Sequence, residues 1–355
     1  MRRCRLRDLG ISPGRLPRGP KNGITDIAGV EVGYATVMAD RPQVVRSGVT
    51  AIWPARDVWQ RPMFAGFHSF NGNGELTGAH WLAEQGLLTA PIAITNTHSV
   101  GLARDAIGAY AARKGVASAW ILPVAAETYD GTLSDAESLS ITMEHVFAAL
   151  DEAKGGPIAE GNVGGGTGMI CHEFKGGTGT ASRVVESGDV TYRVGALVQA
   201  NYGVRELLRV DGVRVGEAIG IDEVPSPRRP RQEGGSIIVI LATDAPLLPI
   251  QCQRLARRAA TGLAWVGGIG ANSSGDLFLA FSTANRIDPA AAVSDVRMAA
   301  PDTMTLLFQA AAEATEEAIL NALTAAETMT GFGGNTAHAL PLDRLQEVMR
   351  RYGRC

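Results

Sequence analysis

Short segments rich in β-branched residues alternate with longer segments of helical periodicity in the first half of the chain. The β-branched segments predict strands at Val30–Ala35, Val49–Trp53, Ile92–Asn96 and Ala119–Pro123. Apolar residues at helical spacing predict helices over Ser99–Lys114 and Ser134–Ala153. Ser134 and Glu137 match the capping-box pattern, so we expect the second helix to begin at Ser134. Strands alternating with helices indicate an α/β fold.

The second half of the chain begins with a glycine-dense segment, Asn162–Arg183, whose composition favours loops and close backbone packing. Beyond it we predict a strand at Tyr192–Ala200, a helix at Pro249–Ala264, a strand at Leu277–Thr283, and a helix at Asp302–Glu327. The turn-rich segment Gly331–Pro341 precedes a short amphipathic C-terminal helix. We find no internal repeat.

An abrupt change of composition occurs near residue 235. The segment Pro225–Gly235, PSPRRPRQEGG, holds three prolines and three arginines and predicts an exposed linker. It is followed directly by Ser236–Leu241, an apolar run typical of a strand that is buried on both faces. A basic loop, two glycines and a serine therefore lead straight into the predicted core.

Composition and charge exclude several classes of protein. The chain has 355 residues, of which 45% are hydrophobic and 19% charged, and its formal net charge is −3. This composition is typical of a globular protein, and it lacks the basic excess expected of one that binds nucleic acid. No apolar run reaches the roughly 18 residues that cross a bilayer. The basic N-terminus lacks the apolar region of a secretory signal, so we expect a cytoplasmic protein that binds no membrane.

Common catalytic and ligand-binding motifs are absent or misplaced. The 43 glycines form no Walker A loop and no dinucleotide-binding fingerprint. The six histidines and four cysteines show none of the spacings of a zinc site, so we expect no metal. A G-x-S-x-G match at Gly10–Gly14 has no strand before it and is interpreted as chance. Cys171 beside His172 does not indicate a thiol enzyme, because chain neighbours rarely meet as nucleophile and base.

The pair Gly235-Ser236 has two interpretations. An ordinary turn before a strand accounts for it without any chemistry. Alternatively, the hydroxyl of Ser236 attacks the preceding carbonyl, and hydrolysis of the resulting ester frees Ser236 as a new N-terminus. The α-amine of such a residue has a pKa of about 7.7–8 and can accept the proton of its own hydroxyl. The residue then carries both nucleophile and base.

Motifs spread over almost the whole chain resemble the DmpA-type family of self-processing N-terminal-serine aminopeptidases, which includes L-aminopeptidase/D-esterases and β-aminopeptidases. The matching segments are Gly23–Thr36, Asn71–Gly78, Ile94–Gly101, Pro123–Gly131, Gly164–Arg183, Val198–Gly203, Gly234–Pro249, Asn272–Asn285 and Gly334–Pro341. The resemblance implies cleavage between Gly235 and Ser236. The single domain of residues 1–355 would then consist of an α-chain, 1–235, and a β-chain, 236–355.

The resemblance also assigns roles to individual residues. Ser236 corresponds to the nucleophile, and Ser274 and Asp276 to a pair that helps to move its proton. Asp276 is one methylene shorter than the Glu of some relatives. Whether it reaches Ser274 or the α-amine is therefore open. Asn201 corresponds to an amide that stabilises the oxyanion.

Two further positions match the family's substrate-binding segment. Glu127 corresponds to a carboxylate that binds the free amine of the substrate, and Tyr129 lies in the same segment. Without the family, ordinary loop or turn positions explain Ser274, Asn201 and Glu127 better than catalytic or binding roles do. Their roles therefore rest on the resemblance alone.

The implied fold is a four-layer αββα sandwich that resembles N-terminal-nucleophile hydrolases but has DmpA-type connectivity. The implied activity is removal of N-terminal residues from small peptides, amides or esters with a free amine, without any cofactor. The implied assembly is a homo-oligomer of αβ units, commonly a tetramer. Two alternatives stay open, an acyltransferase similar to ornithine acetyltransferases, which normally use threonine, and a non-enzymatic oligomeric scaffold.

Overall fold

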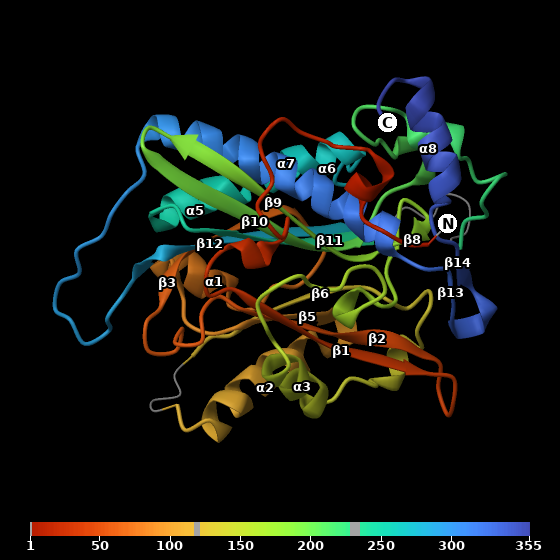
Figure 1. The fold of residues 1–355 in the computed structure, drawn as a ribbon. Coiled ribbons are helices and arrows are strands. Elements are labelled where there is room, and N and C mark those ends of the chain that lie inside the picture. The colour runs from red at the N-terminus through yellow and green to blue at the C-terminus, as the bar shows by residue number, and fades with distance from the viewer. Residues whose placement is uncertain (1, 117–120, 228–234) are drawn as a thin grey trace.

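Two β-sheets pack face to face and are covered by helices on both outer sides, giving four layers (Figure 1). The computed structural model describes residues 2–116, 121–227 and 235–355. The four-stranded sheet has the order β1 (Glu31–Ala39), β2 (Val45–Trp53), β5 (Ile92–Asn96) and β6 (Val124–Thr128). Helices α2 (Val100–Arg113) and α3 (Met143–Asp151) cover its outer face. The αββα arrangement expected from the resemblance is confirmed.

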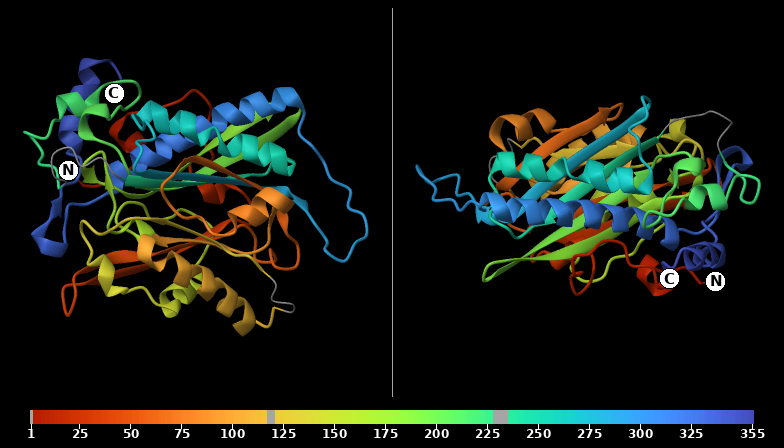
Figure 2. Two further views of the ribbon diagram at one scale, coloured as in Figure 1. Left: turned by 180° about the vertical axis from the view of Figure 1, so that it is seen from behind. Right: turned by 90° about the horizontal axis from the view of Figure 1, so that it is seen from above.

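The larger sheet holds the second half of the fold. Its order is β4 (Leu87–Leu88), β3 (Met63–Gly72), β12 (Ser274–Arg286), β11 (Gly235–Thr243), β10 (Val190–Asn201) and β9 (Gly177–Ser187). Its outer face is covered by α5 (Pro249–Ala256), α6 (Ala259–Val266) and α7 (Pro301–Ala325), as both views of Figure 2 show. Smaller elements are α1 (Ala79–Gln85), α4 (Val215–Ala218), α8 (Leu342–Arg351), β7 (Ile170–Cys171), β8 (Phe174–Lys175), β13 (Met329–Thr330) and β14 (Thr336–Ala337).

Strand β11 lies at the centre of the molecule and separates two hydrophobic cores. Ile238 and Ile240 belong to the core between the sheets, whereas Ile237, Val239 and Leu241 belong to the core beneath α5–α7. Successive side chains alternate between the faces of a strand, and all five are fully buried. Each such side chain contributes about 1.5–3 kcal/mol of burial free energy. The prediction of a strand buried on both faces is confirmed.

The glycine-dense segment forms the start of a long strand as well as loops, and the close backbone packing expected of it is confirmed. Strand β9 begins at Gly177 and packs against α7. A Cβ built on Gly179 would lie 2.0 Å from the carbonyl oxygen of Ala318 in α7. The absence of side chains at such positions lets the helix approach the backbone of the sheet directly.

Two predicted helices differ from those in the structure. The helix expected from Ser134 begins only at Met143, because Leu139 adopts a left-handed backbone with φ of 48°. The helix at Pro249–Ala264 is divided into α5 and α6.

The described part of the strand expected at Ala119–Pro123 forms no strand. Residues 119 and 120 lie outside the described residues, residues 121–123 form no strand, and β6 begins at Val124. In the predicted linker, residues 228–234 also lie outside the described residues. Gly235 already belongs to β11.

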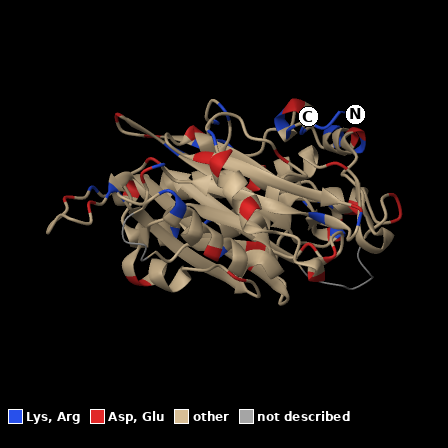
Figure 3. Ribbon diagram, turned by 90° about the horizontal axis from the view of Figure 1, so that it is seen from below, with Lys and Arg blue, Asp and Glu red and all other residues tan. Residues whose placement is uncertain are grey.

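Charged residues are dispersed over the surface, whereas three large exposed apolar residues gather on one projecting segment. Basic and acidic residues are interspersed over the elements in Figure 3, in keeping with the small net charge. The segment between β12 and α7 extends away from the four layers (Figures 1 and 2) and exposes Val293, Val296 and Met298. Within the described residues, no helix combines the length and apolarity needed to cross a membrane.

Candidate active site

Ser236 lies at the start of the central strand β11 and is 5% exposed. It pairs with Asn201 of β10 on one side and with Gly275 of β12 on the other. Its hydroxyl donates a hydrogen bond of 2.6 Å to the carbonyl of Gly235. A Cβ built on Gly235 would lie 2.4 Å from the Asn201 carbonyl oxygen, so this position requires glycine. The hydroxyl thus contacts the peptide group that it is predicted to attack.

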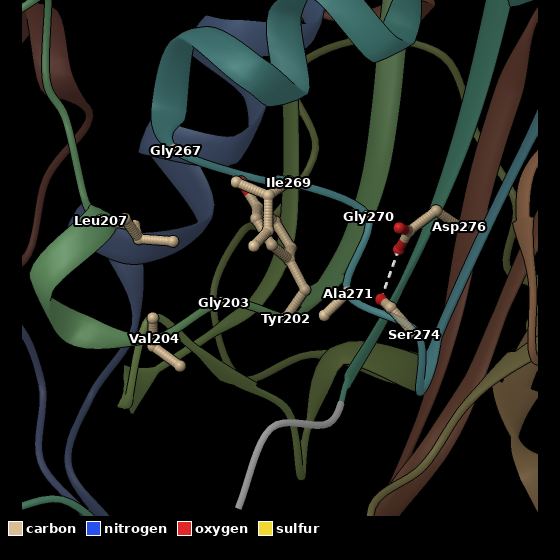
Figure 4. A pocket seen from close by; sticks show the side chains of 10 residues that line it. All are labelled: Tyr202, Gly203, Val204, Leu207, Gly267, Ile269, Gly270, Ala271, Ser274 and Asp276. Atoms are coloured by element: carbon tan, nitrogen blue, oxygen red, sulfur yellow. Dashed lines mark hydrogen bonds between the residues drawn. The ribbon is translucent and has the colours of Figure 1, made fainter. Parts of the chain in front are cut away.

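Ser274 and Asp276 are the two side chains that β12 places beside this strand. The Ser274 hydroxyl donates a 2.6 Å hydrogen bond to the Asp276 carboxylate, drawn as a dashed line in Figure 4. Burial raises the pKa of Asp276 to about 6, although Ser274 and the main-chain N–H of Ile237 both stabilise the charged form. The shorter acid therefore reaches Ser274 and the backbone next to Ser236.

The side chain of Asn201 is fixed by hydrogen bonds at both ends of its amide. Its Oδ1 accepts from the main-chain N–H of Ile170 at 2.8 Å, and its Nδ2 donates to the carbonyl of Tyr129 at 2.9 Å. Because Asn201 is the register partner of Ser236, these bonds hold the amide plane beside the predicted nucleophile. They also join β10 to the segment that follows β6.

Glu127 ends up close to β12, although it belongs to the other sheet. It is 3% exposed, its carboxylate accepts hydrogen bonds from the Thr97 hydroxyl and the Glu75 main-chain N–H, and burial raises its pKa. A Cβ built on Gly74 would lie 3.1 Å from Glu127 Oε1 and 3.2 Å from the Cα of Gly275. Only one glycine therefore separates this carboxylate from the residue that pairs with Ser236.

Tyr129 is half exposed and lies in the same segment as Glu127. Its ring covers Gly131, where a Cβ would lie 2.1 Å from the tyrosine hydroxyl, and its centroid is 6.2 Å from the ring of His98. The structure thus places Tyr129 at the solvent side of the site.

Sequence reasoning missed three residues that shape the site. Asn71 donates from Nδ2 to the carbonyls of Ala271 and Ser274, at 2.5 and 2.7 Å, and so fixes the turn that presents Ser274. Gly74 provides the close approach described above, and Thr97 orients the Glu127 carboxylate. The polar, glycine-rich cluster at Asn71–Gly78 is the only signal in the sequence that marks two of them.

A pocket lies next to Ser274 and Asp276 on the helix side of the larger sheet (Figure 4). It holds about 490 Å³ of empty space, part of it open to solvent, between the segment after β10 and the loop before β12. Its side chains are mainly apolar, with Asp276 as its one charged residue. Among the described residues, no group of three or more His, Cys, Asp or Glu side chains is arranged to hold a metal ion.

Comparison with known proteins decides the family. The sequence pattern of peptidase family S58 matches residues 22–337. This chain belongs to peptidase family S58. A beta-peptidyl aminopeptidase, BapA, from Sphingosinicella microcystinivorans is 46% identical over 99% of this chain and 93% of its own length.

Two solved structures share the fold of this S58 member. The beta-aminopeptidase of a Burkholderia species superimposes with a TM-score of 0.93 and 50% identity, covering 99% of each chain. The L-aminopeptidase D-Ala-esterase/amidase of Ochrobactrum anthropi, described as a new variant of the Ntn-hydrolase fold, gives a TM-score of 0.91 and 44% identity, again covering 99% of each chain. The S58 chain is therefore a hydrolase, an aminopeptidase or amidase of the DmpA type, and the acyltransferase and scaffold alternatives are not favoured.

Proposed function

We propose that this chain matures by cutting itself between Gly235 and Ser236, and that Ser236 then acts as the N-terminal nucleophile. The contact between the Ser236 hydroxyl and the Gly235 carbonyl supports this proposal more directly than any other observation. The hydroxyl oxygen bonds to the carbonyl carbon, the C–N bond breaks, and the amine takes up the hydroxyl proton. Water then hydrolyses the ester, leaving a carboxylate on Gly235 and a free α-amine on Ser236.

Turnover repeats this chemistry on a substrate. The Ser236 hydroxyl adds to the substrate carbonyl while its proton passes to the α-amine, which returns a proton to the departing amine or alcohol. Asp276 and Ser274 stand next to the main chain of residues 236 and 237, where they stabilise the protonated α-amine. The Asn201 amide, held beside Ser236, stabilises the oxyanion, an interaction worth about 3–4 kcal/mol. Water releases the acyl group.

Glu127 selects substrates that begin with a free amine. An ammonium group that binds at this buried carboxylate loses its hydration water. The charge-assisted hydrogen bond to Glu127 offsets that loss. The single glycine between Glu127 and β12 limits the distance from amine to scissile carbonyl to about one residue. Tyr129, exposed next to it, covers the bound residue from the solvent side.

The relatives suggest which N-terminal residue is removed. Proteins named beta-peptidyl aminopeptidase or beta-aminopeptidase are 44–50% identical to this chain over nearly its full length. We therefore propose N-terminal β-aminoacyl peptides and amides as substrates. The similarity to an L-aminopeptidase D-Ala-esterase/amidase favours L-aminoacyl amides and D-alanyl esters as the second candidates.

Mass spectrometry of the purified protein tests maturation and turnover together. We expect two chains, the smaller beginning with Ser236, and hydrolysis of β-alanyl, L-alanyl or D-alanyl p-nitroanilides. The Ser236→Ala variant is expected to stay uncut and inactive, because it has no hydroxyl to attack the Gly235 carbonyl. A continuous chain that is fully active, or cleavage at the same bond in Ser236→Ala, contradicts the proposal.

We also propose that the αβ units assemble into a homo-oligomer, a tetramer of αβ units. The extended segment between β12 and α7 supports this, because Val293 is 83% and Met298 60% exposed in the isolated chain. Large exposed apolar side chains on a projecting segment are typical of a contact surface. Light scattering of the wild type and of Val293→Asp tests the assembly, and the variant is expected to be smaller.

A further inference from the structure

The pocket beside Ser274 has two walls that close backbone contacts hold near each other. Gly267 adopts a φ of 105°, and a Cβ there would lie 1.9 Å from the carbonyl oxygen of Leu207. The loop before β12 therefore lies directly against the segment after β10. Side chains of Leu207, Ile269 and Ala271 line the resulting space, and Ile269 is 68% exposed although it is apolar (Figure 4). Ile269 thus belongs to a concave apolar surface together with Leu207 and Ala271, which a hydrocarbon group can cover.

The alternation of side chains places this pocket on the helix face of the larger sheet, and the Ser236 hydroxyl and Glu127 on the opposite face. Ser236 shares the parity of Ile238, which faces the smaller sheet. Ser274 and Asp276 share the parity of Phe278, which faces the helices. Glu127 belongs to the smaller sheet and approaches Gly275 from that side. The strand ends of the larger sheet thus lie between the carboxylate and the pocket.

A substrate held across this site has a fixed direction. Its amine is bound at Glu127 and its scissile carbonyl lies at Ser236, so the atoms beyond the scissile bond point away from Glu127. The pocket lined by Ala271, Ile269 and Leu207 begins at Ser274, the register partner of Gly235, so these atoms reach it by passing the start of β11. Its apolar walls gain free energy by burying a hydrocarbon side chain, whereas an acidic side chain would be repelled by Asp276.

We propose that this pocket binds the side chain of the residue that follows the scissile bond, and that it selects apolar residues there. The inference rests on the proposed function, because it takes Ser236 as nucleophile and Glu127 as the amine site. The enzyme is thus specific for the second residue of its substrates as well as the first. Peptides with leucine or phenylalanine at that position are better substrates than those with glycine.

Three variants and two series of substrates test this specificity. In the first series the N-terminal residue is constant, β-alanyl or whichever residue the wild type removes, and the leaving group is ammonia, Gly-NH2, Leu-NH2 or Phe-NH2. In the second series the leaving group is Gly-NH2 and the N-terminal residue varies. Ala271→Leu fills the pocket, Leu207→Ala enlarges it, and Ile221→Ala, exposed and outside the pocket, is the matched control. The measured quantity is kcat/KM on matured protein.

The wild type is expected to prefer Leu-NH2 to Gly-NH2 as leaving group by about tenfold or more, the range typical of an apolar pocket. Ala271→Leu should lower this ratio by about tenfold, and Leu207→Ala should shift the preference toward Phe-NH2, while Ile221→Ala leaves the ratio unchanged. If Ala271→Leu blocks maturation, Leu207→Ala carries the test alone.

Two results overturn the assignment while leaving the proposed function intact. One is a leaving-group ratio that none of the variants alters. The other is a change confined to the second series, which would make the pocket a site for the N-terminal side chain. A wild type that matures but cleaves none of these substrates contradicts the proposed function, and the assignment falls with it.

Discussion

Replacing Asp276 by asparagine removes one negative charge from the site with almost no change of shape. The aspartate accepts hydrogen bonds from the Ser274 hydroxyl and from the main-chain N–H of Ile237. Asparagine keeps one acceptor oxygen for the main chain but presents an N–H₂ group to Ser274. The serine must then accept instead of donate, and the proton path to the α-amine of Ser236 reverses.

The expected loss of activity follows from the loss of the charged hydrogen bond between Ser274 and Asp276. A hydrogen bond to a charged group contributes about 1.5–3 kcal/mol. Each 1.36 kcal/mol corresponds to about tenfold in rate, so kcat/KM should fall roughly tenfold to 150-fold. The residual activity reflects Ser236, its α-amine and Asn201, which the substitution leaves in place.

The pH dependence of kcat/KM separates Asp276 from the α-amine as the group that governs activity. In the wild type, activity requires a neutral α-amine, with a pKa of about 7.7–8, and an ionised Asp276. Glu127 must also be ionised to bind the substrate amine, and burial raises its pKa, so it adds to the slope in both proteins. Below the pKa of Asp276, which burial raises, the slope of log kcat/KM against pH should be greater by one in the wild type than in Asp276→Asn. Equal slopes in the two fully matured proteins refute the reasoning.

The same carboxyl predicts a cost in stability. Its pKa is higher in the folded chain than its ordinary 3.8, so the native state binds the proton more tightly than the unfolded state. Stability is therefore lost as the pH rises from about 4 to above 6, and the difference between the two pKa values corresponds to roughly 3 kcal/mol. Burial also raises the pKa values of Asp130, Glu160 and Glu316, so stability falls in this pH range with or without Asp276. In urea unfolding, Ser236→Ala should lose up to roughly 3 kcal/mol more than the same protein carrying Asp276→Asn.

Two further substitutions test the substrate-binding carboxylate and the packing of α7. Glu127→Gln should raise KM for amides with a free N-terminal amine by about tenfold or more, because the charge-assisted contact is lost. Unchanged KM would remove Glu127 from substrate binding. Gly179→Ala should destabilise the fold by about 1–3 kcal/mol, because the added methyl group overlaps the Ala318 carbonyl of α7. Gly108→Ala in α2 is the control, because a Cβ there has no atom within 4 Å outside the backbone of its own helix. It should leave the melting temperature unchanged or raise it.

Elements with a one-sided or fully apolar pattern were predictable from the sequence. The contrast between the basic segment and Ser236–Leu241 located β11, because a strand between two cores tolerates almost no polar residue. The helix expected from Ser134 was wrong because its apolar spacing included Leu139, which is 63% exposed and has a left-handed backbone. Strand β3 was missed, since its glycine, histidine and serine residues weaken the pattern.

The site was predictable only in part, for a physical reason. Glu127, Asn201 and Ser274 belong to three strands of two sheets, and only tertiary pairing brings them next to Ser236. No local pattern reports such pairing, so the family resemblance alone connected them. Gly74 and Asn71 carry no reactive group, and their importance depends on distances that the fold creates.

The strand order of the larger sheet determines how the protein can unfold and refold after maturation. Strands β11 and β12, which follow the proposed cut, are enclosed by β10 on one side and β3 on the other, both of which precede it. Severing the chain at Gly235 therefore releases neither fragment, because each is hydrogen-bonded within the same sheet. It does, however, turn refolding from a unimolecular into a bimolecular process. Once matured and then denatured, the enzyme is expected to recover poorly in dilute solution, so that assembly is in practice a one-way event.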